Sequence, residues 1–137
     1  MWKTVLAILL LAGCAQIPPS ERDIQAKRFE PVPGKAVVYI VRDNVGAHLD
    51  HSLWLDDSTQ ITTHTGTYYR WEVAPGTHRI QGGAESTARL ELNVEAGKIY
   101  FVRHIVNGIV WNAAYQTGLQ RLDDETGRAR VSQAILL

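Results

Sequence analysis

The chain has 137 residues, and its 14 lysines and arginines equal its 14 aspartates and glutamates, so its formal net charge at pH 7 is zero. This balance provides no basic field for nucleic acid, and we expect no nucleic-acid partner. Cys14 is the only cysteine, which excludes a disulfide within the chain. Setting aside the first 13 residues leaves 124, which is enough for one domain that buries its own core.

The N-terminal residues have the pattern of a secretory signal. Lys3 supplies a positive charge, and residues 4–12 are apolar except at the first position. This stretch is too short to span a bilayer, which needs about 20 apolar residues, and its length suits a signal peptide. The small residues Ala12 and Gly13 precede Cys14 and leave the backbone accessible to a peptidase.

Residues 11–14, LAGC, resemble the lipobox of bacterial lipoproteins. In that family the cysteine sulfur carries a diacylglycerol, the chain is cleaved just before the cysteine, and the new amino group receives a further acyl chain such as palmitate. The resemblance implies a signal peptide at residues 1–13 and lipidation at Cys14, and two or three acyl chains anchor a protein stably. Ala15 replaces the aspartate that retains enterobacterial lipoproteins in the inner membrane. The resemblance therefore implies the periplasmic face of the outer membrane.

Residues 14–35 have the composition of a lipidated N-terminus and tether. Pro18 and Pro19 block regular structure and favour an extended path. The charged residues 20–29 have the composition of one or two helical turns, and the Pro- and Gly-rich residues 31–34 end them. We expect this segment to act as a spacer between the membrane and a domain at residues 36–137.

Short strands separated by turn residues are the pattern of the domain. Apolar and polar residues alternate along most of these segments, which is typical of strands with one buried face. Asn107-Gly108 is the strongest two-residue hairpin signal. The expected strands are residues 36–42, 52–56, 60–65, 68–73, 77–81, 88–94, 98–106 and 109–115. Their number and spacing predict a mainly β fold, an antiparallel β-sandwich of about seven or eight short strands.

The last part of the chain changes character. Asp123 or Asp124 can cap a helix, and apolar or small residues follow at helical spacing. This pattern predicts a short C-terminal α-helix over residues 124–135 that packs on a sheet or its edge. Gly127 disfavours that helix, because glycine is a poor helix former.

Two aromatic residues are candidates for contact with a partner. If Leu53 and Leu55 face the core, Trp54 faces outward, and Tyr68 faces outward if Trp71 faces inward. Exposed Trp and Tyr side chains can stack on sugar rings or anchor a protein partner. The alternative, which we favour, is that the C-terminal helix or another strand covers this face and makes both residues part of the core.

The histidines raise the question of a metal site. His48, Asp50 and His51 lie within four residues, and a hairpin brings His64 across from them. Such side chains suit zinc or copper, but no third ligand follows at a defined spacing, and a polar loop at the domain rim explains them equally. We therefore assign no metal and expect no cofactor. His78 and His104 are expected to be strand residues, with His78 facing inward and hydrogen-bonded to the backbone.

Catalytic motifs are missing from the sequence. It has no Gly-x-Ser-x-Gly elbow and no glycine-rich phosphate loop before a helix. The aspartate pairs at 56–57 and 123–124 lie at a turn and a helix start, where aspartate serves structure. We therefore expect no enzyme.

The order of these segments resembles a family of uncharacterised bacterial lipoproteins, known only as a domain of unknown function. The turn at residues 74–78 is also similar to that of PEGA-type β-sandwich modules of surface proteins. The segments that carry the resemblance, which covers residues 36–106, are 37–42, 53–56, 68–73, 74–78 and 96–101. These are turn and core motifs, so the resemblance implies a fold and no catalytic or binding residue.

These observations predict a non-enzymatic binding or structural module of the bacterial envelope. It would be held by acyl chains on Cys14 and would contact an envelope protein, a lipid or a glycan. Two alternatives stay open, a periplasmic metal-binding protein that uses His48 and His51, and a module that binds glycan or peptidoglycan.

Overall fold

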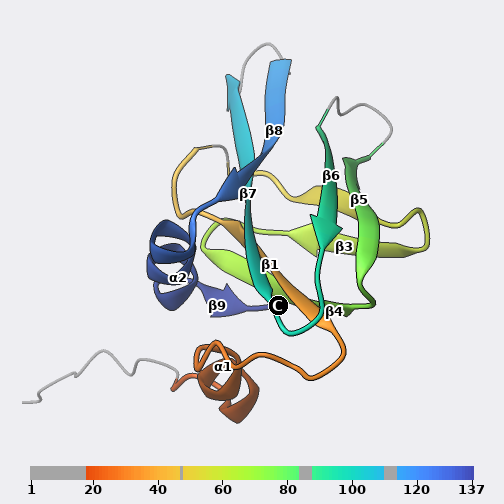
Figure 1. Ribbon diagram of the computed structural model, residues 1–137. Coiled ribbons are helices and arrows are strands. Elements are labelled where there is room, and N and C mark those ends of the chain that lie inside the picture. Colours follow the sequence, from red (N-terminus) through yellow and green to blue (C-terminus); the bar gives the residue numbers. More distant parts are fainter. Residues whose placement is uncertain (1–17, 47, 84–87, 110–113) are drawn as a thin grey trace, which may run out of the picture.

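The computed structural model describes residues 18–46, 48–83, 88–109 and 114–137, and two sheets and two helices account for most of this part of the chain (Figure 1). The helices are α1 (Glu21–Ala26) and α2 (Asp124–Ser132). The strands are β1 (Ala36–Arg42), β2 (His51–Leu55), β3 (Thr59–Thr63), β4 (Thr67–Val73), β5 (Gly76–Gly82), β6 (Arg89–Val94), β7 (Ile99–Ile109), β8 (Ala114–Leu122) and β9 (Ile135–Leu136).

The two sheets have the orders β8-β7-β1-β4-β9 and β3-β2-β5-β6, and we call them the five-stranded and the four-stranded sheet. Most neighbours are antiparallel, whereas β1 pairs with β7 and β4 pairs with β9 in parallel. The predicted fold class, mainly β in two sheets with a short C-terminal helix, is confirmed. None of the described helices is both long and apolar enough to cross a membrane.

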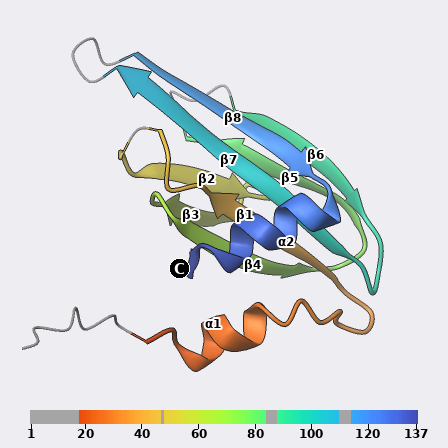
Figure 2. The same ribbon diagram turned by 90° about the vertical axis from the view of Figure 1, so that its left-hand side faces the viewer.

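Strand β1 is the centre of the molecule, because all seven of its residues are buried. Its side chains alternate between two cores. Ala36, Val38 and Ile40 pack between the sheets against Leu53, Leu55 and their neighbours. The side chains between them, Val37, Tyr39 and Val41, pack on the outer face of the five-stranded sheet beneath the helices. Figure 2 shows α2 lying across this face, where it contacts β7 and β1.

Helix α2 begins as the sequence predicts and ends earlier. Asp123 is its N-cap, and the Asp123 carboxylate accepts a hydrogen bond of 2.8 Å from the backbone N–H of Thr126. The predicted end, Ile135, lies instead in β9. Gly127 faces Phe101, where a β carbon would lie 2.6 Å from Cδ2 and closer still to Cγ. The glycine that disfavours the helix therefore lets the helix approach the sheet.

The hairpin predicted at Asn107-Gly108 is wrong. Strand β7 continues through both residues, and they lie opposite Gln116 and Tyr115 of β8. Because β8 supplies a strand partner for each of them, the ladder overrides the local preference of Asn-Gly for a turn. Strand β8 therefore replaces the strand expected at residues 109–115, and the connection at 110–113 lies outside the described residues.

The tether predicted at residues 14–35 is also corrected in part, because α1 packs on the domain. Ser20 caps this helix by accepting a hydrogen bond from the backbone N–H of Asp23. Asp23 is buried, and its carboxylate accepts from the Tyr68 hydroxyl at 2.6 Å and the Leu136 N–H at 3.2 Å. The Tyr39 hydroxyl donates to the carbonyl of the last helical residue at 2.6 Å. A domain that starts at Ala36 would omit this packed helix.

Candidate functional site

The predicted lipidation site, Cys14, lies outside the described residues. Tyr68, one of the two aromatic partner candidates, is not exposed. Its side chain is fully buried under α1, with its hydroxyl bonded to Asp23. Burial, together with this carboxylate, raises the pKa of Tyr68. Tyr68 therefore does not face a partner and is a core residue, the alternative that we favour, although a helix from the predicted tether covers it in place of the C-terminal helix or another strand.

Trp54, the other candidate, lies on the outer face of the four-stranded sheet. Its side chain is 37% exposed, whereas Leu53 and Leu55 on either side of it are buried between the sheets. The main contacts of both helices are with strands of the five-stranded sheet, and no described helix lies over this face. The alternative of a covered core residue therefore holds for Tyr68 and not for Trp54.

Polar side chains flank Trp54 along one line across the sheet. The registers place Gln60 of β3 and Gln81 of β5 opposite Trp54, and Arg89 of β6 opposite Gln81. We call Gln60, Trp54, Gln81 and Arg89 the Trp54 row. Strands lie about 4.8 Å apart, so the row crosses about 14 Å of surface. A glutamine amide both donates and accepts hydrogen bonds, so the row combines an aromatic surface with groups that bind hydroxyls.

Charges on this face of the sheet are balanced. Arg79 lies opposite Glu91 on the next outward-facing line, and Glu91 also lies 3.7 Å from Arg89. Nη1 of Arg79 also lies 3.4 Å from a carboxylate oxygen of Asp57. Two arginines thus face two carboxylates, and this arrangement suits an uncharged polar ligand better than an ion.

His78 lies on the inward-facing side of β5, where its ring contacts Trp71 of the five-stranded sheet, and it has the role that its sequence position predicts. Its Nε2 lies 2.6 Å from the carbonyl oxygen of Ala74, and its Nδ1 lies 2.6 Å from a carboxylate oxygen of Asp56. Burial by itself lowers the pKa of His78, but the bonds to these two acceptors outweigh it, so the pKa is raised. This arrangement ties the turn after β2 to β5 and leaves neither His78 nitrogen for a ligand.

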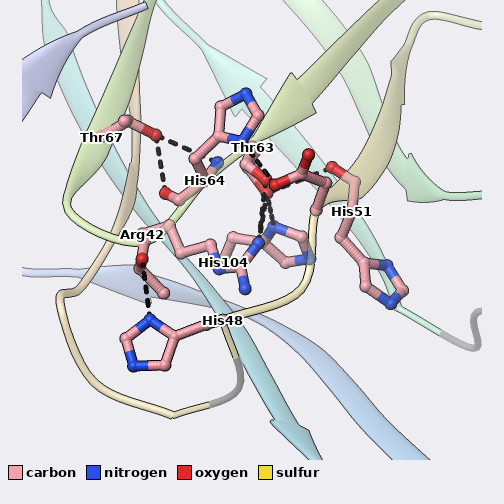
Figure 3. Close-up of polar contacts among 9 residues, drawn as sticks. Arg42, His48, His51, Thr63, His64, Thr67 and His104 are labelled. Carbon is pink, nitrogen blue, oxygen red and sulfur yellow. Dashed lines mark hydrogen bonds and ion pairs between the residues drawn. The ribbon is translucent and has the colours of Figure 1, made fainter.

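The four metal candidates lie near one another, with His48, His51 and His64 shown in Figure 3 and Asp50 bonded to His64. They do so as separate pairs, with His48 Nδ1 3.3 Å from the Thr65 hydroxyl and His64 Nδ1 2.5 Å from the Asp50 carboxylate. His51 turns toward His104 with ring centroids 6.0 Å apart. In the part of the chain that the structure describes, no three His, Cys, Asp or Glu side chains are grouped so that they could hold a metal ion.

A buried polar cluster of Arg42, Thr63 and His104 lies behind these histidines (Figure 3). Arg42 Nη1 donates to the Thr63 carbonyl at 2.9 Å, and the Thr63 hydroxyl lies 2.9 Å from His104 Nδ1. The same hydroxyl donates to the carbonyl of His51 at 3.2 Å. Burial, with the charges of Arg42 and His51, lowers the pKa of His104 to about 3, so the ring is neutral at ordinary pH.

The sequence analysis missed this polar cluster, although a signal for it exists. Arg42 follows Val38 and Ile40 at the spacing of inward-facing residues, and His104 likewise follows Tyr100 and Val102. In each of these two strands, a polar residue therefore continues the row of inward-facing apolar residues. This pattern indicates that one end of the otherwise apolar core is polar. Thr63 carries no such signal, because threonine is common on either face of a strand.

A known family pattern matches residues 33–119, which is more than half of the chain. The chain belongs to the DUF2846 family of proteins of unknown function. This confirms the predicted membership of an uncharacterised domain family. The DUF2846 region contains the whole Trp54 row and the polar cluster, whereas Cys14, α1, α2 and β9 lie outside it. No curated protein and no solved structure matches the chain significantly.

Proposed function

We propose that this protein is a bacterial envelope lipoprotein, held at the outer membrane by acyl chains on Cys14, whose domain is a non-enzymatic binding module. The lipobox resemblance at residues 11–14 supports the anchor. The domain has one apolar core between its two sheets and a second beneath its helices, and these two cores support a fold that is stable without disulfides. The ligand surface in this proposal is the Trp54 row, and the ligand is a glycan of the envelope.

The exposure of Trp54 in the middle of a polar sheet face carries this proposal. Sugar rings have apolar C–H faces that pack on an indole, and their hydroxyls both donate and accept hydrogen bonds, as do the amides of Gln60 and Gln81. A row about 14 Å long accommodates a chain of sugars rather than a single ring. Peptidoglycan is the glycan that a periplasm-facing outer-membrane lipoprotein meets, so we choose it as the probe.

The glycan proposal is tested by co-sedimentation with purified peptidoglycan sacculi. The wild-type protein is expected to sediment with the sacculi, and Trp54→Ala is expected to reduce the bound fraction at least tenfold at limiting protein. Asn93→Ala is the matched control, because Asn93 is exposed on β6 of the same sheet and is not part of the Trp54 row. Thermal unfolding of both variants checks that the fold is kept. Equal binding by wild type and Trp54→Ala would refute the role of the row.

The anchor is tested separately with Cys14→Ser. Serine has no sulfur to accept the diacylglycerol, so the variant is expected to remain an uncleaved precursor without acyl chains. Mass spectrometry of the membrane fraction reports both cleavage and acylation. A variant that is still cleaved and still membrane-anchored would contradict the proposed role of Cys14.

A further inference from the structure

Two arginines share one carboxylate just after the end of β1. Oδ2 of Asp43 lies 2.6 Å from Nε of Arg103 in β7 and 2.6 Å from Nη1 of Arg130 in α2. Arg103 lies opposite Val41 in the parallel register of β1 and β7. Because Val41 packs in the core beneath the helices, Arg103 also faces the helix side of the five-stranded sheet. We call Asp43, Arg103 and Arg130 the Asp43 cluster, which connects two neighbouring strands of this sheet to α2.

The Asp43 cluster carries an excess of positive charge. Its two guanidinium groups and one carboxylate give a net charge of +1. The cluster lines a pocket of about 350 Å³, and Asp43 is the only acidic residue among the described residues of that lining. A third arginine of the lining, Arg42, is buried and donates to the Thr63 carbonyl, so its guanidinium is used within the core.

Both arginines of the cluster keep N–H groups for a further acceptor. A guanidinium has five N–H donors, and the bonds to Asp43 use one nitrogen of each arginine. The side chains of Arg103 and Arg130 are 26% and 35% exposed, so a dissolved molecule can reach them. Nε of Arg130 is buried and has no partner among the described residues. A structural ion pair with Asp43 needs one arginine, and the second leaves a positive charge for a bound anion.

The surroundings of the cluster favour a carboxylate over a phosphate. Gln133, the C-cap of α2, lines the pocket, so the nearby helix end is the one with partial negative charge. Phosphate sites commonly use the opposite helix end, whose backbone N–H groups point at the ligand. A net charge of +1 matches one carboxylate, and planar guanidinium groups match its two oxygens. The pocket also has apolar lining, from Val45, Gly66 and Ala134, and its volume is at the lower end for small-molecule sites.

We propose that the Asp43 cluster binds the carboxylate of a small organic anion, with Arg103 and Arg130 as donors and the carbon skeleton against the apolar lining of the pocket. The site lies on the helix side of the five-stranded sheet, whereas the Trp54 row lies on the outer face of the four-stranded sheet. The proposal therefore depends neither on glycan binding nor on acylation of Cys14.

The test is an NMR titration of the full-length protein, in a non-ionic detergent, with N-acetylalanine as the probe. N-acetylalanine amide is the matched control ligand, because it has the same skeleton without the charge, and inorganic phosphate is the third ligand. Ionic strength is kept low and constant, because salt screens exposed charges. With N-acetylalanine we expect saturable shifts of the Nε–H signals of Arg103 and Arg130. We expect no saturable shift with the amide, and weaker binding of phosphate.

Arg130→Gln is expected to weaken the binding of N-acetylalanine about tenfold, because it removes a charged donor. Arg128→Gln is the matched control variant. Arg128 lies in the same helix and pairs with Asp124 at 2.8 Å, so this variant loses the same charge away from the pocket. Its affinity is expected to stay within about twofold of wild type, because distant exposed charges are screened. Thermal unfolding checks that both variants keep the fold, and Arg103→Gln replaces Arg130→Gln if that variant unfolds.

The proposal is overturned if N-acetylalanine gives no saturable shift, or if the amide binds equally well. Equal affinities of Arg128→Gln and Arg130→Gln would also overturn it, because they would show general attraction between charges in place of a site. Tighter binding of phosphate than of N-acetylalanine would overturn the choice of a carboxylate and would identify the cluster as a phosphate site.

Discussion

Replacing Gly127 with alanine tests how closely α2 approaches the five-stranded sheet. In an exposed helix this change stabilises the helix by about 1 kcal/mol, because glycine is the weaker helix former. Here the new β carbon would lie 2.6 Å from Cδ2 of Phe101, about 1 Å inside an ordinary carbon–carbon contact. Phe101 is buried and stacks on Tyr39, so the ring cannot turn aside without disturbing the core under the helices. Overpacking of this kind costs about 1–3 kcal/mol, and the overlap favours the upper end. We expect a net loss of about 2 kcal/mol in the free energy of unfolding.

Urea unfolding followed by intrinsic tryptophan fluorescence measures this change. Ala129→Gly in the same helix is the control, since Ala129 is exposed and the variant isolates helix propensity. It is expected to lose about 1 kcal/mol. If Gly127→Ala were instead more stable than wild type, the close approach of α2 to Phe101 would be refuted.

Three further predictions concern buried or paired polar groups. Since burial lowers the pKa of His104 to about 3, its ring should stay neutral by NMR at pH 5, and a titration midpoint near 6.5 would contradict its burial. Its contribution to stability should be complete above pH 6.5 and fall by up to about 1.4 kcal/mol per pH unit as the pH drops toward 3. The pKa of His78 is raised by Asp56, so the stabilisation from this pair should be present below pH 6.5 and disappear as the pH rises through the raised value. In Asp56→Asn, the free energy of unfolding measured against pH should no longer show this loss. Tyr68→Phe removes the closest donor to the buried Asp23 and should cost about 1.5–3 kcal/mol of stability in urea; an unchanged midpoint would show that α1 does not depend on this bond.

The strands that the sequence predicts well are those whose pattern is local. Residues 88–94 alternate cleanly, and the structure places β6 there with Leu92 and Val94 buried. The segments at 52–56 and 60–65 pair as a hairpin through a short turn. In each case the alternation of side chains and the nearest turn define the strand, and no distant part of the chain changes the outcome.

The features that the sequence did not predict depend on distant partners. Asn107-Gly108 stays extended because β8 pairs with it, and β9 exists because residues 135–136 find a partner in β4. The strand pattern around Tyr68 is the same whether its face of the sheet meets water or a helix, so the sequence leaves both environments open for this side chain. Only the packing of α1, which is remote in sequence, decides between these environments.

Aromatic residues occur on both outer faces of the sandwich, but packing explains them on one face only. On the five-stranded sheet, Tyr39, Tyr68 and Phe101 fill the core beneath the helices, so packing accounts for them. On the four-stranded sheet the outward positions are polar, and no described helix needs an apolar partner there. Packing therefore does not account for a tryptophan at position 54. Threonine at this position would favour the strand as well and would expose less apolar surface to water. Trp54→Thr should accordingly leave the free energy of unfolding within about 0.5 kcal/mol of wild type while it abolishes binding to sacculi. A loss of several kcal/mol would show instead that the indole supports the sheet, and would remove the observation on which the glycan proposal depends.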